Sequence, residues 1–210
     1  MKLSVSFLKS NYRKEETIRK IEKTTADFIH VDLMDGIYAG ENNIDMERLD
    51  CLLWNSTKPL DIHLMVKKPF ELIKEIVYLK PTYVTFHVDI DDDIDKIINY
   101  LKRKGIKVGL TLNPNQDYTL LDPYINKIDQ LLIMTVVPGL GGQSFRLDVL
   151  PKIKKMSNIK KLNNYKYIIN VDGGINDQTI DLVKEQVDMV VSGSYICCSD
   201  NYQRRIDRLK

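Results

Sequence analysis

Residues 60–112 read LDIHLMVKKPFELIKEIVYLKPTYVTFHVDIDDDIDKIINYLKRKGIKVGLTL. In this stretch, three short apolar or β-branched runs alternate with two longer runs whose polar residues have helical spacing. Pro69 stands where the first helical run begins, a position that tolerates proline, and Gly105 follows the second run, where a left-handed residue commonly ends a helix. This order of strands and helices predicts a parallel sheet covered by helices.

The same alternation extends along the whole chain, as eight apolar runs that are each followed by a helical run. The expected strands span residues 3–7, 28–33, 60–65, 83–86, 107–112, 130–136, 167–171 and 189–192. The expected helices span residues 14–23, 44–54, 69–79, 92–104, 118–128, 147–156, 177–185 and 202–209. Eight such units in 210 residues favour an α/β fold of the (β/α)₈ (TIM) barrel type, with residues 1–210 as one domain. An open doubly wound sheet is the alternative, but the glycine-rich turn expected after its first strand is missing.

The composition excludes several functional classes. With 31 Lys and Arg against 29 Asp and Glu, the net charge of +2 offers no excess of positive charge for nucleic acid or a membrane surface. No apolar run approaches the roughly 18 residues that suggest a membrane span. The three cysteines, Cys51, Cys197 and Cys198, fit neither a disulfide framework nor a metal-binding spacing, so free thiols in the cytoplasm are expected.

Four side chains that commonly bind metal ions fall at the ends of expected strands, where a (β/α)₈ barrel places its chemistry. His30 and Asp32 are two residues apart on one strand and therefore share a face. His63 follows on the next strand, and Asp172 comes from the seventh, across the barrel. Two imidazoles and two carboxylates suit one divalent metal ion, and such mixed ligation admits Zn, Fe(II), Mn or Co. For any one histidine alone, a hydrogen-bonded role in the core is the alternative.

Glycine-rich segments follow the sixth, seventh and eighth expected strands. Their members are Gly139, Gly141, Gly142, Gly173, Gly174, Gly193 and Ser194. Glycine lets backbone N–H groups converge on an anion, and the last loops of a (β/α)₈ barrel commonly bind phosphate. The alternative is that these glycines only make turns. No Gly-Lys-Ser/Thr follows, so a nucleotide-binding P-loop is excluded.

Four further residues near strand ends allow two interpretations. His87 lacks an acidic partner pattern like that of His30 and is expected to support the site or the core. Met34, Met65 and Met134 would usually fill the core, but their places at strand ends equally favour the lining of a pocket.

Six motifs lie between Ser6 and Ser194: HVDLMDG (30–36), HLMV (63–66), LNP (112–114), MTV (134–136), PGLGGQSF (138–145) and VDGG (171–174). In these motifs and in their order, the chain closely resembles the ribulose-phosphate 3-epimerase family. The resemblance implies a (β/α)₈ barrel that interconverts D-ribulose 5-phosphate and D-xylulose 5-phosphate in the pentose phosphate pathway.

The resemblance also implies the roles of individual residues. One divalent metal ion would be held by His30, Asp32, His63 and Asp172, with Asp32 and Asp172 as the two acid/base groups. Ser6 and His63 would contact the substrate, and the glycine segments would hold its phosphate. The three methionines named above match family positions that line the pocket.

The chain departs from the family pattern at a few positions. Residues 38–42 lack the proline that the family usually carries in this loop, Val137 replaces a usually polar residue, Leu140 replaces a usual Phe, and Asn170 stands where an acidic residue is frequent. None of these positions is a proposed ligand or acid/base group.

Other functions remain as alternatives. A sister 3-epimerase acting on D-allulose 6-phosphate is the closest of them. A metal-dependent hydrolase and a sugar-phosphate-binding barrel without turnover are more distant. The expected partner is a small phosphorylated ketose, with no nucleic acid and no membrane, and the chain is expected to form a homo-oligomer through an exposed helix.

Overall fold

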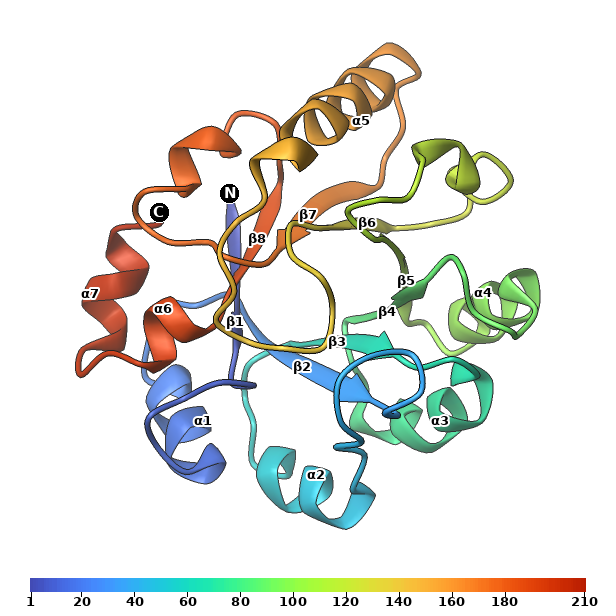
Figure 1. The fold of residues 1–210 in the computed structure, drawn as a ribbon. Coiled ribbons are helices and arrows are strands. Elements are labelled where there is room, and N and C mark those ends of the chain that lie inside the picture. Colours follow the sequence, from blue (N-terminus) through green and yellow to red (C-terminus); the bar gives the residue numbers. More distant parts are fainter.

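A computed structural model describes all residues 1–210, and its eight strands form one closed, parallel barrel in sequential order (Figure 1). The strands are β1 (Lys2–Ser6), β2 (Phe28–Met34), β3 (Leu60–Met65), β4 (Tyr83–His87), β5 (Lys107–Leu112), β6 (Gln130–Met134), β7 (Ile168–Asp172) and β8 (Met189–Ser192). The parallel pairing of β1 with β8 closes the ring. The predicted (β/α)₈ barrel is therefore confirmed, and the open doubly wound sheet is wrong.

Helices surround the barrel and connect successive strands (Figure 1). The α-helices are α1 (Lys14–Glu22), α2 (Met46–Leu53), α3 (Pro69–Ile76), α4 (Ile94–Arg103), α5 (Leu150–Leu162), α6 (Ser194–Cys197) and α7 (Tyr202–Asp207). Four 3₁₀ turns complete the set: η1 (Val77–Leu79), η2 (Tyr118–Leu121), η3 (Leu147–Val149) and η4 (Ile180–Leu182). None of the helices is long and apolar enough to cross a membrane.

Two predicted helices, at residues 118–128 and 177–185, are wrong. The first is reduced to η2 because Pro123 lacks a backbone N–H and disfavours helical geometry in the residue before it. The second is reduced to η4, where local side-chain bonds compete with helix formation. Asn176 accepts from the N–H of Thr179, whose hydroxyl donates to the carbonyl of Gly174.

Helix α6 was not predicted from the sequence; it is a single turn that begins directly after Gly193. Four residues are too few to produce a helical pattern. The helix predicted at 147–156 begins instead with η3 and continues as α5 to Leu162. As predicted, Pro69 lies in the first turn of α3, and Gly105 after α4 has a positive φ of 71°.

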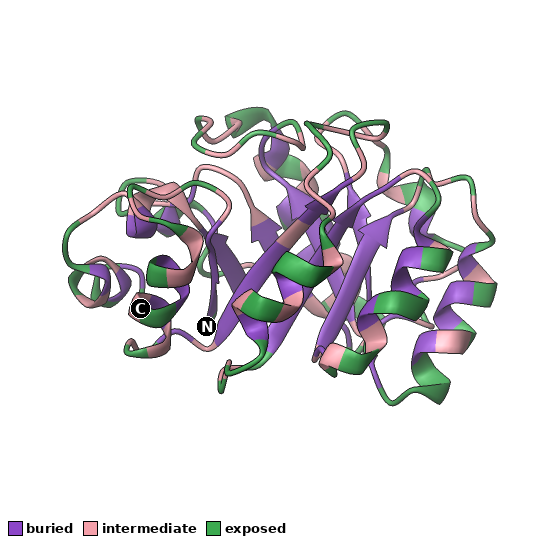
Figure 2. Ribbon diagram, turned by 90° about the horizontal axis from the view of Figure 1, so that it is seen from below, coloured by how far each residue is buried: buried purple, intermediate pink, exposed green.

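The strands are buried on both faces, as Figure 2 shows by their almost uniform colour. In β3, Leu60, Ile62 and Leu64 belong to the apolar core that packs strands against helices. Asp61 and His63 alternate with them and point into the barrel, where they bond to side chains of other strands. Exposed residues lie on the outer helix faces and in the loops (Figure 2).

The interior of the barrel around Asp61 is lined by polar side chains, whereas apolar side chains usually fill the interior of this fold. The Asp61 carboxylate accepts from Ser4 Oγ at 3.0 Å and lies 2.8 Å from His30 Nδ1. Gln130, from the opposite wall, donates to Asp61 at 3.4 Å and to Thr85 Oγ1 at 2.8 Å. This network joins five strands and supplies partners to a carboxylate that is fully buried.

We expect Gly109→Ala to destabilise the barrel. A Cβ at Gly109 in β5 would lie 2.8 Å from both Cβ and Cγ2 of Thr85, so we expect an overpacking cost of about 1–3 kcal/mol in the free energy of unfolding, measured by urea denaturation. Combined with Thr85→Ala, the cost should be less than additive, because the contact with Thr85 Cγ2 is removed while the contact with Cβ remains. Gly105→Ala is the control: its Cβ would contact nothing, so its strain cost should add fully to that of Thr85→Ala. Additive costs for Gly109→Ala would contradict the steric explanation.

Candidate active site

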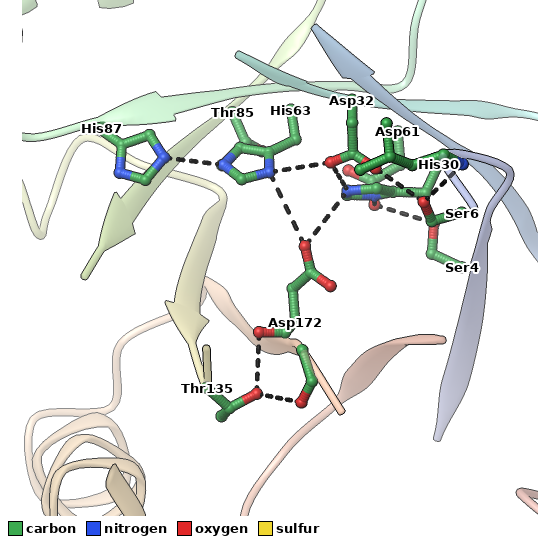
Figure 3. A network of polar contacts seen from close by, with 12 residues as sticks. Ser4, Ser6, His30, Asp32, Asp61, His63, Thr85, His87, Thr135 and Asp172 are labelled. Carbon is green, nitrogen blue, oxygen red and sulfur yellow. Dashed lines mark hydrogen bonds and ion pairs between the residues drawn. The ribbon is translucent and has the colours of Figure 1, made fainter. Parts of the chain in front are cut away.

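Four side chains converge at the carboxyl ends of β2, β3 and β7 (Figure 3). They are His30, Asp32, His63 and Asp172, and one ligand atom from each lies within 4.8 Å of the others. Asp32 Oδ1 is 3.3 Å from both His30 Nε2 and His63 Nδ1. Asp172 Oδ2 faces the same two nitrogens at 3.7 and 3.8 Å. The register that pairs Asp32 with His63 explains why two neighbouring strands present these groups together.

The four side chains fit a divalent metal ion. His30 Nε2 and His63 Nδ1 are buried, and neither has a hydrogen-bond partner. Buried polar atoms without partners are rare, and here both point at the two carboxylates. Two imidazole nitrogens with two carboxylate oxygens form a donor set suited to Zn²⁺ and related transition metals, so the cluster could hold such an ion.

The first imidazole of this cluster is oriented by the polar network below it. His30 Nδ1 lies 2.8 Å from the Asp61 carboxylate, which has no proton donor role when ionised, so Nδ1 carries the hydrogen. Once the second ring proton is lost, the lone pair lies on His30 Nε2, the nitrogen that faces Asp32 and Asp172. A carboxylate behind a histidine is a common arrangement around metal ligands.

The second imidazole is oriented by another histidine. His63 Nε2 lies 3.0 Å from His87 Nε2. Burial, followed by the charge of His63, lowers the pKa of His87 well below its usual range, so His87 is neutral. Donation from His63 Nε2 to His87 Nε2 then leaves a lone pair on His63 Nδ1, as metal ligation requires. This contact explains the supporting position that the sequence suggested for His87.

The two carboxyl groups of the cluster differ in proton affinity. Burial raises the pKa of Asp172 to about 6, opposed by His30 and reinforced by Asp32. Burial would also raise the pKa of Asp32, but His30 and His63 outweigh it and hold that pKa well below the usual range. For His30, burial would lower the pKa, yet Asp32 and Asp61 raise it well above the usual value. The cluster is thus a buried concentration of negative charge that favours a bound cation.

A cavity of about 340 Å³ opens above this cluster. Of the residues singled out in the sequence, Ser6, Asp32, Met65, Met134, Gly139, Gly141, Gly142, Asp172, Gly173, Gly174, Gly193 and Ser194 line it. His30 and His63 lie fully buried behind the carboxylates. Met34 does not line the cavity, because its sulfur is covered by the loop at Gly40. Ser6 donates from Oγ to Asp32 Oδ2 at 2.7 Å.

The loop between β6 and η3 lies across the barrel mouth (Figure 1, yellow). Gly139 in this loop has φ of 112°, and a Cβ there would lie 2.6 Å from the backbone nitrogen of Gly40. Only glycine allows the two loops to approach so closely. Gln143 braces the loop from within, donating to the carbonyls of Val137 and Leu140 at 2.6 and 2.8 Å. The loop therefore covers the cavity with its own backbone.

Tyr38 anchors the β2–α2 loop. Its hydroxyl donates to Asp89 at 2.7 Å and accepts from the Asn113 amide at 2.7 Å. Its ring lies against His87, with centroids 4.5 Å apart. Burial and the Asp89 carboxylate raise the pKa of Tyr38, so the hydroxyl keeps its proton. This anchor could not be predicted from the sequence, because Asp89 follows β4 and Asn113 follows β5.

Solved structures with the same fold share little sequence with this chain. 3-Hexulose-6-phosphate synthase from Salmonella typhimurium has a TM-score of 0.68 and 18% identity, covering 100% of this chain and 96% of that chain. N-(5'-phosphoribosyl)anthranilate isomerase from Pyrococcus furiosus has a TM-score of 0.66 and 17% identity, covering 100% and 96%. At these identities the likeness shows the fold alone, which is that of the (β/α)₈-barrel enzymes.

Sequence relatives narrow this class to one family. The model of the ribulose-phosphate 3 epimerase family matches residues 2–197. Ribulose-phosphate 3-epimerase from Helicobacter pylori is 34% identical over 212 residues, covering 100% of this chain and 97% of that protein. The protein of the same name from Escherichia coli is 30% identical over 211 residues, covering 99% and 94%. The chain belongs to the ribulose-phosphate 3-epimerase family and is an isomerase, which confirms the resemblance seen in the sequence.

We expect His87→Phe to weaken metal binding, because it removes the acceptor that orients His63. The dissociation constant for Zn²⁺ or Co²⁺, measured by competition with a chelator, should rise about 10–100-fold. His87→Gln, whose side-chain oxygen can accept the same hydrogen bond, should retain most of the affinity. Circular dichroism would verify that both variants fold. Equal metal affinity in wild type and His87→Phe would contradict this role.

Proposed function

We propose that this chain interconverts D-ribulose 5-phosphate and D-xylulose 5-phosphate by inverting the configuration at C3. The observation that carries the proposal is that two carboxylates from distant strands, Asp32 on β2 and Asp172 on β7, face the same pair of buried histidine nitrogens. Membership of the ribulose-phosphate 3-epimerase family supports the same reaction.

Inversion at C3 moves a proton off one face of the sugar and returns a proton to the other. The C3 hydrogen is acidic because it lies next to the C2 carbonyl, and its loss leaves a 2,3-enediolate. A single base cannot easily serve both faces, so two positioned carboxyl groups are needed. Asp32 and Asp172 would take these roles, and the direction of the reaction would decide which removes the proton and which returns one.

His30, Asp32, His63 and Asp172 would hold one divalent metal ion. When bound, the ion would act as a Lewis acid that stabilises negative charge on the substrate oxygens by several kcal/mol. The chain's own part is to hold the two imidazoles in the required tautomers through Asp61 and His87. Zn, Fe(II), Mn and Co all suit these ligands.

Other parts of the cavity would bind and position the rest of the ketose. The glycine segments after β6, β7 and β8 line the cavity, and their backbone N–H groups would bind the phosphate. Thr135 Oγ1 donates to the carbonyls of Asp172 and Gly173 at 2.8 and 2.6 Å, which fixes the backbone that carries one acid/base group. The loop across the mouth and the buried Met65 and Met134 would exclude water from the reacting carbon.

We further propose that residues 1–210 act as one catalytic domain in the cytoplasm. The substrate class is a small phosphorylated ketose, and self-association through an exposed helix remains a prediction that gel filtration would test.

Asp172→Asn should abolish epimerisation and leave the fold intact. Loss of one general acid/base group should lower kcat by about 10²–10⁴-fold. Because Asp32 remains, the variant should still exchange the C3 hydrogen of one epimer with deuterium from solvent, detected by NMR, without inverting it. Asp200→Asn, at an exposed position far from the cluster, is the matched control and should keep wild-type turnover. Near-normal turnover in Asp172→Asn, with its metal content verified, would overturn the two-carboxylate mechanism.

The substrate itself is tested by a steady-state comparison. We expect kcat/KM to be higher for D-ribulose 5-phosphate than for D-allulose 6-phosphate, and a higher value for the hexulose would reverse the choice. Mass spectrometry separates epimerisation from hydrolysis, because an epimer has the mass of its substrate. A binding protein without turnover would exchange no hydrogen at C3.

A further inference from the structure

Lys9 lies in the loop between β1 and α1, on the wall of the cavity. Its side chain runs along the glycine segment that follows β6. A Cβ on Gly141 would lie 2.9 Å from Lys9 Cβ, and a Cβ on Gly142 would lie 2.7 Å from Lys9 Nζ. The absence of side chains at these two glycines therefore leaves the space that the Lys9 stem and ammonium occupy.

The charge of Lys9 is unpaired. No carboxylate lies within ion-pair distance of its ammonium, and the ammonium donates no hydrogen bond. Six of the chain's 23 lysines are paired with Asp or Glu, and Lys9 is not among them. Among the residues that line the cavity, Lys9 has the only basic side chain, and Asp32 and Asp172 have the only acidic ones. The cavity thus has its negative charge at the floor and one free positive charge at the glycine-rich wall.

We propose that the Lys9 ammonium binds the phosphate group of the substrate beside the backbone of Gly141 and Gly142. This inference rests on the proposed function, because it assumes a phosphorylated ligand in this cavity. Backbone N–H groups supply only partial charges, whereas a phosphate at neutral pH carries nearly two negative charges. An ammonium at the same wall provides the missing full charge and a strong hydrogen bond.

Lys9 would also set which end of the substrate enters first. The carboxylates at the cavity floor repel a dianion, and the lysine at the wall attracts it, so the two charges together favour one orientation. The exposed ammonium loses little hydration before the ligand arrives. Its contribution should therefore appear mainly as affinity for phosphorylated ligands and should weaken with salt.

Lys9→Met tests the proposal, because methionine keeps the stem that packs on the glycines and removes only the charge. Binding of inorganic phosphate, measured by calorimetry, should weaken about 5–20-fold, the loss expected for one charge-assisted hydrogen bond in a partly exposed site. Lys9→Arg should retain most of the affinity. Lys102→Met, on the outer face of α4, removes an equal charge far from the cavity and should bind phosphate as the wild type does.

Kinetics provide a second readout. The preference for D-ribulose 5-phosphate over D-ribulose, measured as the ratio of their kcat/KM values, should fall about tenfold in Lys9→Met. The effect should be carried mainly by KM, and the salt dependence of KM should become shallower than in wild type. A purely structural role for the Lys9 stem would move neither the ratio nor the salt dependence.

The outcomes separate this inference from the proposed function. Unchanged phosphate affinity in Lys9→Met overturns the role of Lys9, even if the wild type is an active epimerase. A clear loss of phosphate affinity supports the role of Lys9, even if the wild type fails to epimerise the pentulose phosphates. Wild-type protein that binds no phosphate overturns the inference outright.

Discussion

The buried carboxylate of Asp61 links the polar interior of the barrel to the candidate active site. It sits in the barrel interior with no exposed surface, where an ionised group is stable only if hydrogen-bond donors surround it. Ser4, His30 and Gln130 supply those donors from three other strands. In doing so the carboxylate fixes the hydrogen of His30 on Nδ1, so a group that links several strands also orients a nitrogen that could bind a metal ion.

Much of this arrangement could be predicted from the sequence. Strand order and the shared face of His30 and Asp32 follow from local patterns, because a strand places alternate residues on one side. The convergence of Asp172 with them follows from the closure of eight parallel strands. The two helices predicted after β5 and β7 are only short 3₁₀ turns, because a proline and short polar side chains disfavour α-helical backbone there in spite of the helical spacing of apolar residues.

The contacts between separate loops could not be predicted. Lys9, Tyr38 and Asp61 meet partners that lie far away in sequence, and only the folded barrel shows which partners these are. Met34 lies at a strand end, as predicted, but the adjoining loop covers it, so it does not line the cavity. Position along a strand thus predicts the direction of a side chain and leaves open what lies above it.

The line of contacts from Tyr38 through His87 to His63 has a consequence for how the chain can vary. Tyr38 belongs to a surface loop, yet only the ring of His87 separates it from His63, whose Nδ1 faces the centre of the site. A substitution that repositions this loop would tilt His87 and with it His63. Sequence drift in that loop is therefore limited by the geometry of the His30, Asp32, His63 and Asp172 cluster as well as by packing.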